Sequence, residues 1–265
     1  MSKQATIQAF NYAKNEYTNV QRQIERQYKK TLDFIRIELS KMDLSKTFKG
    51  GRLANLKKLI DNEMIALTKG NYKIINSSRI KTFYNAYEKF WKESGLPMPK
   101  LNTDFIKSVL ANPLQETKFK DALSDLTKKN ASKINEIITD GLTKGDTIYD
   151  TAKIIKSTFE GYSTYQSKLI AKQETLRALT EGQLTATERL KDRGFKVVKV
   201  WVYNHNPKSP REYHQVLDEV EADEEGNFHI DSPEEGEIIT EAPRMSGIAS
   251  NDVGCSCSYY NRIVD

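Results

Sequence analysis

The chain of 265 residues is poor in cysteine and histidine, with two cysteines and three histidines. Two cysteines are too few for the disulfide framework that stabilises small secreted domains. Their Cys-x-Cys spacing also disfavours a bond between them, because residues i and i+2 of a strand lie about 6.6 to 7 Å apart, at or beyond the usual disulfide range. We therefore expect Cys255 and Cys257 to be reduced.

The chain also lacks long apolar runs and glycine-rich catalytic loops. The first ten residues have neither the basic start nor the apolar stretch of a signal peptide, and the longest apolar segment, residues 197–203, is interrupted by Lys199. Gly50 and Gly51 are not followed by the Gly-Lys-Ser/Thr ending of a phosphate-binding loop, and no nucleophile turn is visible. These absences predict a protein made in the cytoplasm, with no membrane contact and no catalytic or cofactor-binding residues.

Charge is divided unevenly along the chain. Residues 195–265 carry 6 Lys/Arg and 14 Asp/Glu, a formal charge of −8, whereas residues 1–194 carry the remaining 35 and 22, a charge of +13. A basic helical surface suits a polyanion such as DNA, whose phosphates bind lysine and arginine without regard to base sequence. Basic side chains that only solvate exposed helices explain the same charge equally well.

Apolar or small residues recur between residues 7 and 42 at a mean spacing of 3.5, the spacing of a coiled-coil seam on a helix. They are Ile7, Phe10, Ala13, Tyr17, Val20, Ile24, Tyr28, Leu32, Ile35, Leu39 and Met42. Because the other faces are polar, a second helix must cover this stripe. That helix belongs either to the same chain or to another copy, so self-association is a candidate contact.

The next segments continue the helical pattern. Gly50 and Gly51 should end the first helix, and apolar periodicity predicts helices over residues 53–70 and 72–93, separated at Gly70 and Asn71. Aromatic residues on one face of the latter favour core packing over a partner interface. They are Phe83, Tyr84, Tyr87, Phe90 and Trp91.

Proline marks the clearest linker, residues 95–99, because each proline removes an N–H donor and restrains the residue before it. Four further helices are expected, near residues 103–111, 114–140, 147–159 and 163–192. At Phe195 the apolar period changes to two, which predicts short strands.

These patterns predict a mainly α protein. We expect an elongated helical N-terminal body with coiled-coil-like packing, followed by a small C-terminal α+β domain. The predicted domains are a helical hairpin or bundle over residues 1–94, a further helical region over 95–194, and the acidic α+β domain over 195–265.

All three histidines, including His205, and both cysteines lie within the last 61 residues. Residues 209–212, Ser-Pro-Arg-Glu, have the pattern of a helix start, so Arg211 and His214 should share one face of a short helix. The two cysteines would share one face of a terminal strand. Candidate zinc ligands are therefore His214, Cys255 and Cys257, with His229 as a fourth.

A second interpretation needs no metal, and the spacing favours it, because common zinc ribbons have Cys-x₂-Cys. His214 would then hydrogen-bond to a carbonyl or to Asp218, bracing with Arg211 the acidic loop that follows, and the cysteines would be small buried apolar residues. No cofactor is expected in this case, with zinc as the alternative. The acidic run over 218–226 departs from the calcium-loop order, so a solvated hairpin tip is expected there.

Several motifs occur in an order that resembles a known family. They are Gly141-Leu-Thr-Lys-Gly145, Ala171-Lys-Gln-Glu174-Thr, Gly182, Gly194, Trp201, Arg211-Glu-Tyr-His214, Phe228, Pro243 and Gly254-Cys-Ser-Cys257. Over about half the chain, from roughly residue 130, this order resembles the phage head-morphogenesis family, the Mu F-like minor head proteins of tailed bacteriophages. The resemblance implies that the motif residues have structural roles. They are Glu174, Trp201, Arg211, His214, Cys255 and Cys257.

The resemblance further implies a non-enzymatic minor capsid protein located in the virion, inside the capsid, and made in the host cytoplasm. Such a protein is bound inside the procapsid near the portal and assists head assembly, DNA packaging or DNA delivery. Its expected partners are the portal protein, packaged double-stranded DNA, and scaffold or major capsid protein.

Two rival functions remain open. One is a zinc- or thiol-dependent enzyme carried in the virion, which would use His214, Cys255 and Cys257 and would also need a third orienting group and an oxyanion site. The other is a DNA-binding accessory protein with no role in the virion.

Overall fold

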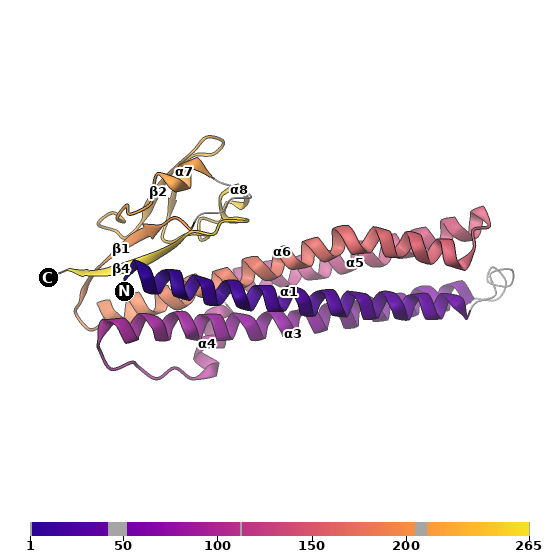
Figure 1. Cartoon of the computed structure of the whole chain (residues 1–265), viewed down its shortest axis with the longest axis horizontal. Coiled ribbons are helices and arrows are strands. Elements are labelled where there is room, and N and C mark those ends of the chain that lie inside the picture. The colour runs from indigo at the N-terminus through magenta and orange to yellow at the C-terminus, as the bar shows by residue number, and fades with distance from the viewer. Residues whose placement is uncertain (1, 42–51, 112, 205–210, 265) are drawn as a thin grey trace. The chain divides into compact units, whose positions relative to one another are not determined.

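The computed structural model describes residues 2–41, 52–111, 113–204 and 211–264. These residues form two compact units, each assembled from separate segments of the chain. Unit 1 comprises residues 1–18, 77–112 and 172–265, and unit 2 comprises residues 19–76 and 113–171. Three long helices, α1 (Lys3–Ser40), α3 (Arg52–Ser94) and α6 (Ile148–Lys191), contribute a segment to each unit (Figure 1).

Unit 2 is a bundle of helical segments packed along their apolar faces. The second half of α1 and the first half of α3 lie beside α5 (Pro113–Lys144) and the first half of α6 (Figure 1). Val20, Ile24, Ile35 and Leu39 of the predicted seam are buried in this core. The seam is therefore covered within the chain itself, apart from Met42, which lies outside the described residues.

Helix α3 is continuous, whereas the sequence pattern predicted a break at Gly70 and Asn71. Both residues lie inside the helix, and a Cβ atom at Gly70 would collide with the side chain of Gln27 on α1. Glycine in a helix costs about 1 kcal/mol relative to alanine, and α3 continues through it because its apolar residues pack in the core of unit 2. In the same way, α6 is one helix where two were predicted, and α5 continues through Gly141 to Lys144.

The helical part of unit 1 contains the start of α1, the end of α3, α4 (Thr103–Leu110) and the second half of α6. Phe83, Tyr87, Phe90 and Trp91 are buried, which confirms the core position predicted for the aromatic residues of α3. Tyr84 differs, since it is 37% exposed.

The second half of α6 is buried, and so are many of its polar side chains. One ion pair and two hydrogen bonds join these side chains to other parts of unit 1. Glu174 pairs with Arg79 of α3, with 3.3 Å between Oε2 and Nε. Gln183 donates to the carbonyl of Tyr259 at 3.1 Å. The hydroxyl of Thr187 accepts from Asn261 Nδ2 at 2.5 Å.

The C-terminal part of unit 1 contains two antiparallel pairs of strands and two short helices. β1 (Lys196–Val202) pairs with β4 (Ser258–Val264), and β2 (Phe228–Ser232) pairs with β3 (Gly236–Thr240). The short helices are α7 (Glu212–Gln215) and α8 (Ala249–Asp252). Trp201, Phe228, Ile230 and Tyr259 form the centre of the apolar core that these elements share.

The predicted fold class is confirmed, since a mainly helical body precedes a small C-terminal region of strands and short helices. The three predicted domain ranges stay a prediction, and the two units follow a different division because long helices pass from one unit into the other. In the described part of the chain, no helix has an apolar stretch long enough to span a bilayer.

Gly182→Ala should destabilise unit 1. A Cβ at this position of α6 would lie 2.5 Å from the backbone oxygen of Phe83, which cannot rotate away. We expect the free energy of unfolding, measured by urea denaturation, to fall by roughly 1–3 kcal/mol, the usual cost of overpacking.

Gly70→Ala is the matched control, because the added methyl meets only the end of the flexible Gln27 side chain. It should change stability by less than Gly182→Ala does, since alanine also favours the helix. Equal stability of Gly182→Ala and the wild type would contradict the packing described for α6.

Lys199 of β1 should titrate near neutral pH. Its side chain is only 4% exposed, and its Nζ donates to the carbonyl of Glu241 at 2.6 Å. Burial lowers the pKa of Lys199 to about 8, although the carboxylate of Glu241 opposes the shift. NMR of ¹³C-labelled lysine should therefore find one side chain with a midpoint near this pH, absent in Lys199→Met.

The linked effect on stability has a definite sign. Between the folded pKa of about 8 and the ordinary value of 10.5, the unfolded chain binds a proton at Lys199 that the folded chain has lost. Lys199 therefore makes stability rise with pH across this window. The unfolding free energy of the wild type minus that of Lys199→Met should increase from pH 8 to pH 10. A difference that stays constant over this range would contradict the burial of the amine.

Candidate functional site

The structure brings His214, Cys255 and Cys257 together in unit 1. His214 comes from α7, and the two cysteines lie in the segment just before β4, whereas the sequence placed them within the strand. All three side chains are buried, with exposed fractions of 1%, 4% and 2% respectively. One ligand atom from each residue lies within 4.8 Å of the other two.

One imidazole nitrogen faces both sulfur atoms. His214 Nδ1 lies 3.6 Å from Cys255 Sγ and 3.7 Å from Cys257 Sγ. The backbone N–H of Cys257 donates to Cys255 Sγ at 3.4 Å, which holds the Cys-x-Cys segment in a tight curve. The three side chains form a compact thiol-imidazole cluster.

Asn251 of α8 sets the orientation of the imidazole. Its Nδ2 donates to Ser246 Oγ at 3.1 Å and to Asp252 Oδ1 at 3.3 Å, so its Oδ1 faces His214 as an acceptor. His214 Nε2 lies 2.7 Å from that oxygen and must donate to it. In neutral His214 the lone pair is therefore on Nδ1, directed at the two sulfurs.

Arg211 supports the same segment from the first residue of the α7 turn. Its guanidinium donates to the carbonyls of Asn251 at 2.5 Å and Val253 at 2.6 Å. Arg211 and His214 thus converge on the loop around α8, whereas the sequence predicted that they would brace the acidic loop after α7. Asp218 instead accepts from the backbone N–H of Tyr203 and pairs with Lys3.

Charges and dipoles around the cluster separate the pKa values of the two thiols. The hydrogen bond from Cys257, helped by His214 and the buried Arg244, holds the pKa of Cys255 well below its usual range although burial opposes this. The hydrogen bond to Cys255, together with burial, raises the pKa of Cys257, although the positive charge of Arg244 opposes this.

The other predicted site residues lie elsewhere or outside the described residues. His229 is on β2, exposed, and its two ring nitrogens contact Glu237 and Asp223 at 2.8 and 2.9 Å. It is not part of the cluster of His214 and the cysteines. His205 and the predicted helix cap at Ser209 and Pro210 fall outside the described residues.

Sequence reasoning missed two residues that support the cluster. Asn251 lies next to an aspartate in a segment without a recognisable motif, and nothing local indicates that it contacts His214. Arg244 is fully buried and donates to the carbonyl of Cys257 and to Thr180 of α6. Both contacts join segments that are distant along the chain, so no spacing rule reveals them.

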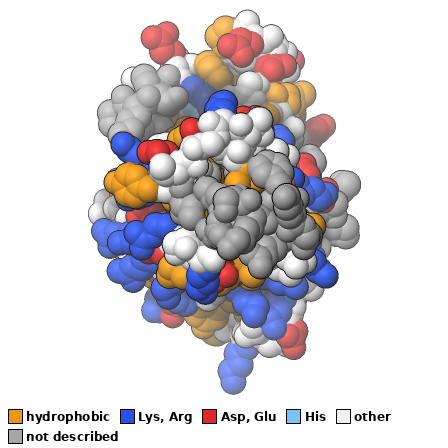
Figure 2. Space-filling model, turned by 90° about the vertical axis from the view of Figure 1, so that its right-hand side faces the viewer, with side chains coloured by type: hydrophobic (Ala, Val, Ile, Leu, Met, Phe, Trp, Pro, Cys, Tyr) orange, Lys and Arg blue, Asp and Glu red, His pale blue; other side chains and the backbone are white. Residues whose placement is uncertain are grey.

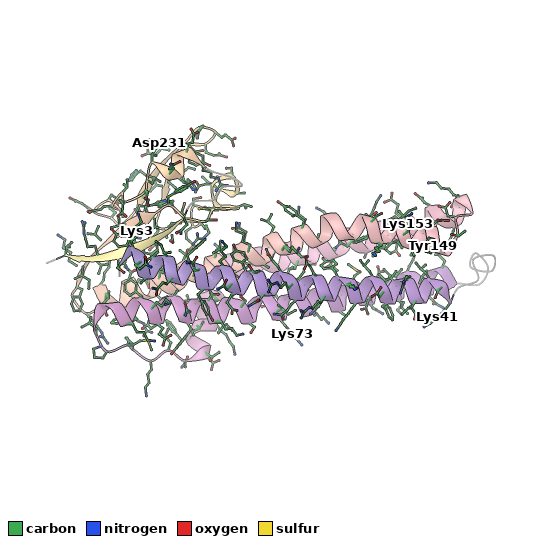
Figure 3. The ribbon with its side chains drawn as sticks, viewed as in Figure 1. Lys3, Lys41, Lys73, Tyr149, Lys153 and Asp231 are labelled. Carbon is green, nitrogen blue, oxygen red and sulfur yellow. The ribbon has the colours of Figure 1, made fainter. Side chains whose placement is uncertain are left out.

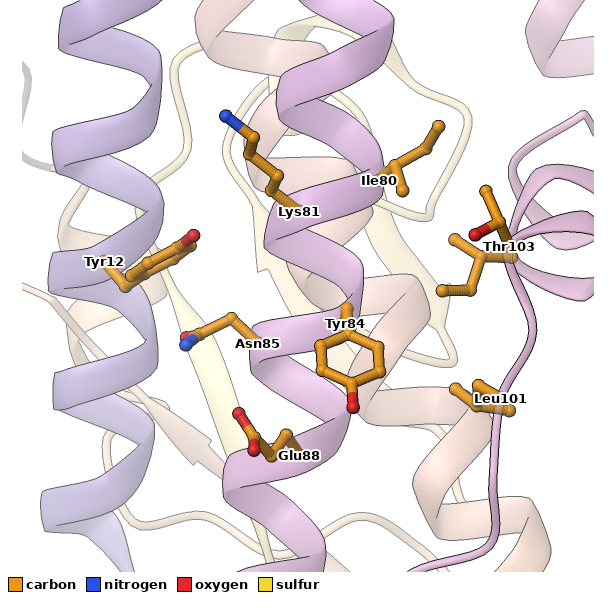
Figure 4. Close-up of a pocket in the computed structure, with 9 residues that line it drawn as sticks. Tyr12, Ile80, Lys81, Tyr84, Asn85, Glu88, Leu101 and Thr103 are labelled. Carbon is orange, nitrogen blue, oxygen red and sulfur yellow. The ribbon is translucent and has the colours of Figure 1, made fainter.

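Unit 1 also has a surface hollow of about 380 Å³ beside the end of α3. Its wall carries Tyr84, Lys81, Glu88 and Tyr12, with Leu101 and Thr103 on the opposite side (Figure 4). The mixture of one acid, one base and two tyrosines suits no particular charged ligand.

Unit 2 has a larger hollow, of about 670 Å³, between α1 and α6, which we call the α1–α6 hollow. Its floor contains the buried Tyr28, Ile35, Leu39 and Ile155. Polar and aromatic residues form the rim. They are Glu25, Lys29, Asp33, Arg36, Tyr149, Lys153 and Lys156. Tyr149 is 76% exposed and lies near Lys153 on α6 (Figure 3).

Comparison with known proteins finds one named relative. The NAD(+)--arginine ADP-ribosyltransferase EFV of Enterococcus faecalis (strain ATCC 700802 / V583) is 29% identical over 163 residues, which are 62% of this chain and 32% of that protein. The chain thus spans about a third of the length of this relative. No family model and no solved structure matches the chain.

This similarity contradicts the resemblance to phage head-morphogenesis proteins. The prediction of a non-enzymatic minor head protein is therefore wrong, because the similarity is to an enzyme and no head-protein family matches. The expected contacts with portal, scaffold or capsid protein and DNA, and the location in the virion, stay untested predictions.

The structure explains why the motif order was misleading. Glu174 pairs with a buried arginine, Trp201 fills the apolar core, and Arg211 binds backbone carbonyls. These are packing roles, and packing residues identify a fold more readily than a function.

The pair of Glu174 and Arg79 allows a direct test of such a packing role. Arg79 is 2% exposed, so removing the carboxylate leaves a buried guanidinium without its counter-charge. We expect Glu174→Gln to lower the free energy of unfolding by about 3–5 kcal/mol.

Replacing both partners is the control. The double variant Arg79→Met and Glu174→Leu should be more stable than Glu174→Gln, because it removes the uncompensated charge. Chemical denaturation of the single and double variants measures this difference. If the double variant were less stable than Glu174→Gln, the ion pair with Glu174 would not be what stabilises the buried guanidinium of Arg79.

Proposed function

We propose that the chain is an enzyme that transfers ADP-ribose from NAD⁺ to arginine side chains. The observation that carries this proposal is the 29% identity over 163 residues to an arginine ADP-ribosyltransferase. Because the chain spans 32% of that protein, its activity and both substrates are part of the proposal.

The reaction sets requirements that a site must meet. The bond between ribose C1′ and the nicotinamide nitrogen breaks with oxocarbenium character, and nicotinamide leaves with the bonding electrons. A guanidinium nitrogen of arginine forms the new bond to C1′ and loses a proton to a carboxylate or to water. The site therefore needs cations for the diphosphate, a surface for an aromatic ring, and a carboxylate for the incoming guanidinium.

The α1–α6 hollow meets these requirements best among the described residues. Its volume of about 670 Å³ lies within the usual range for small-molecule sites. Arg36, Lys153 and two further lysines, Lys29 and Lys156, stand on its rim. Figure 2 shows Lys and Arg side chains gathered mainly in the lower half of the face that it presents. A diphosphate would bind these cations, while the exposed ring of Tyr149 would stack on a base.

The hollow also supplies carboxylates. Asp33 Oδ1 lies 3.8 Å from the guanidinium of Arg36, and Glu25 pairs with Lys168. Among the described residues, Asp33 makes one exposed ion pair, and we propose that it receives the guanidinium of the substrate arginine and accepts the released proton. The thiol-imidazole cluster has no part in this step, because side chains with exposed fractions of 4% or less cannot reach a protein substrate.

The activity can be tested with the full chain, NAD⁺ labelled in the adenine ring, and an arginine-rich protein acceptor. We expect label to appear on the acceptor and nicotinamide to be released in equal amount. Hydroxylamine-type cleavage or mass spectrometry then identifies arginine as the modified residue. Failure to transfer label or release nicotinamide would refute the proposed function.

The hollow itself is tested by charge reversal. Lys153→Glu should raise the KM for NAD⁺ roughly tenfold, the equivalent of one charge-assisted hydrogen bond to phosphate. Lys73→Glu makes the same charge change on an exposed lysine of unit 2 outside the hollow, and should leave KM nearly unchanged (Figure 3). Equal KM values for the two variants would exclude the hollow as the NAD⁺ site.

A further inference from the structure

A second site lies in unit 1, independent of the proposed transfer reaction. We propose that His214, Cys255 and Cys257 bind one zinc ion, with Nδ1 and the two sulfurs as ligands. The ion would tie α7 to the segment that precedes β4.

The two nitrogen–sulfur separations match those of a tetrahedral zinc site. Zinc bonds of about 2.3 Å to sulfur and about 2.0–2.1 Å to nitrogen place adjacent N and S ligands about 3.5 Å apart at the tetrahedral angle. His214 Nδ1 lies 3.6 and 3.7 Å from the two sulfurs. Both nitrogen–sulfur pairs can therefore share one ion, and one ligand atom from each of the three residues lies within 4.8 Å of the other two.

A network of hydrogen bonds alone satisfies the cluster less well. Nδ1 has one lone pair, so only one of the two thiols can donate to it, and the other can donate only to the neighbouring sulfur, which is a weak acceptor. A zinc ion replaces both thiol protons and uses the lone pairs of all three residues. Two thiolates also neutralise the charge of the ion, which suits a buried position.

The imidazole is already held in the form that a metal requires. The Nε2–H of His214 donates to Asn251 Oδ1 at 2.7 Å, and the side chain of Asn251 is fixed by Ser246 and Asp252. A metal-bound histidine usually donates its other N–H to an oxygen in this way, which fixes its ring. Arg211 binds the backbone carbonyls of Asn251 and Val253 at the C-terminal end of α8, so Asn251, which orients the imidazole, is itself supported.

The donor set favours zinc over calcium and magnesium. Thiolate and imidazole are ligands for zinc and related transition metals, whereas calcium and magnesium prefer oxygen ligands. Among the described residues, three side chains form the group, and a tetrahedral site has one further ligand position. Because all three ligands are buried, we assign the ion a structural role.

Metal content tests the assignment without any assay of activity. The full chain is purified under reducing conditions, loaded with zinc, passed over a desalting column and measured by mass spectrometry of metals. We expect one zinc ion per chain in the wild type and loss of this ion in Cys255→Ser and His214→Gln. His229→Gln is the matched control, since this histidine lies on β2 outside the cluster, and it should keep the ion.

If the ligand variants fail to fold, cobalt substitution of the wild type tests whether the two cysteines and His214 bind a metal ion. Co²⁺ bound by two thiolates and one imidazole should give sulfur-to-cobalt charge-transfer absorption in the near ultraviolet and intense tetrahedral bands in the visible. Absence of these bands together with absence of bound zinc would overturn the proposal. Equal zinc content in His214→Gln and His229→Gln would also overturn it, whether or not the chain transfers ADP-ribose.

Discussion

Unit 1 depends on the burial of polar side chains along the second half of α6. A buried polar group without a partner costs free energy, so each such residue needs a specific contact. Glu174 finds Arg79 of α3, whereas Gln183 and Thr187 find partners on β4. An apolar helix could pack against its neighbouring elements in many alternative positions, because apolar contacts are not directional. These polar contacts instead specify which residues of α3 and β4 must face α6, and in this way they determine the arrangement within unit 1.

The same constraint extends to the cluster of His214 and the two cysteines. Thr180 of α6 accepts from Arg244, and Arg244 also donates to the carbonyl of Cys257. The buried guanidinium thus joins the helix to the segment that carries both thiols. Its positive charge favours thiolate at Cys255, whose pKa is held low by the Cys257 hydrogen bond as well. The position and the ionisation of these sulfur atoms therefore both depend on a residue anchored to α6.

Local patterns in the sequence predicted much of the fold, and they failed where distant contacts decide the structure. The stripe on α1 is predictable because burial of one helical face produces a regular spacing. Gly70 was read as a break, since glycine weakens a helix locally, but the nearby Gln27 of α1 gives it a packing role. His214 and the cysteines were grouped correctly by residue type. Asn251 and Arg244 were not predicted, because their contacts join segments without a shared motif.

The difference between predicting a fold and predicting a function follows from what each kind of residue does. Glu174, Trp201 and Arg211 occur in an order that resembles head-morphogenesis proteins, yet each makes a packing contact that any function tolerates. The α1–α6 hollow has the opposite character, because its exposed lysines and Tyr149 contribute little to the core. Its residues follow no motif, and sequence alone did not group them. A site of this kind becomes visible only when the two helices lie side by side, and its ligand must then be argued from charge, volume and chemistry.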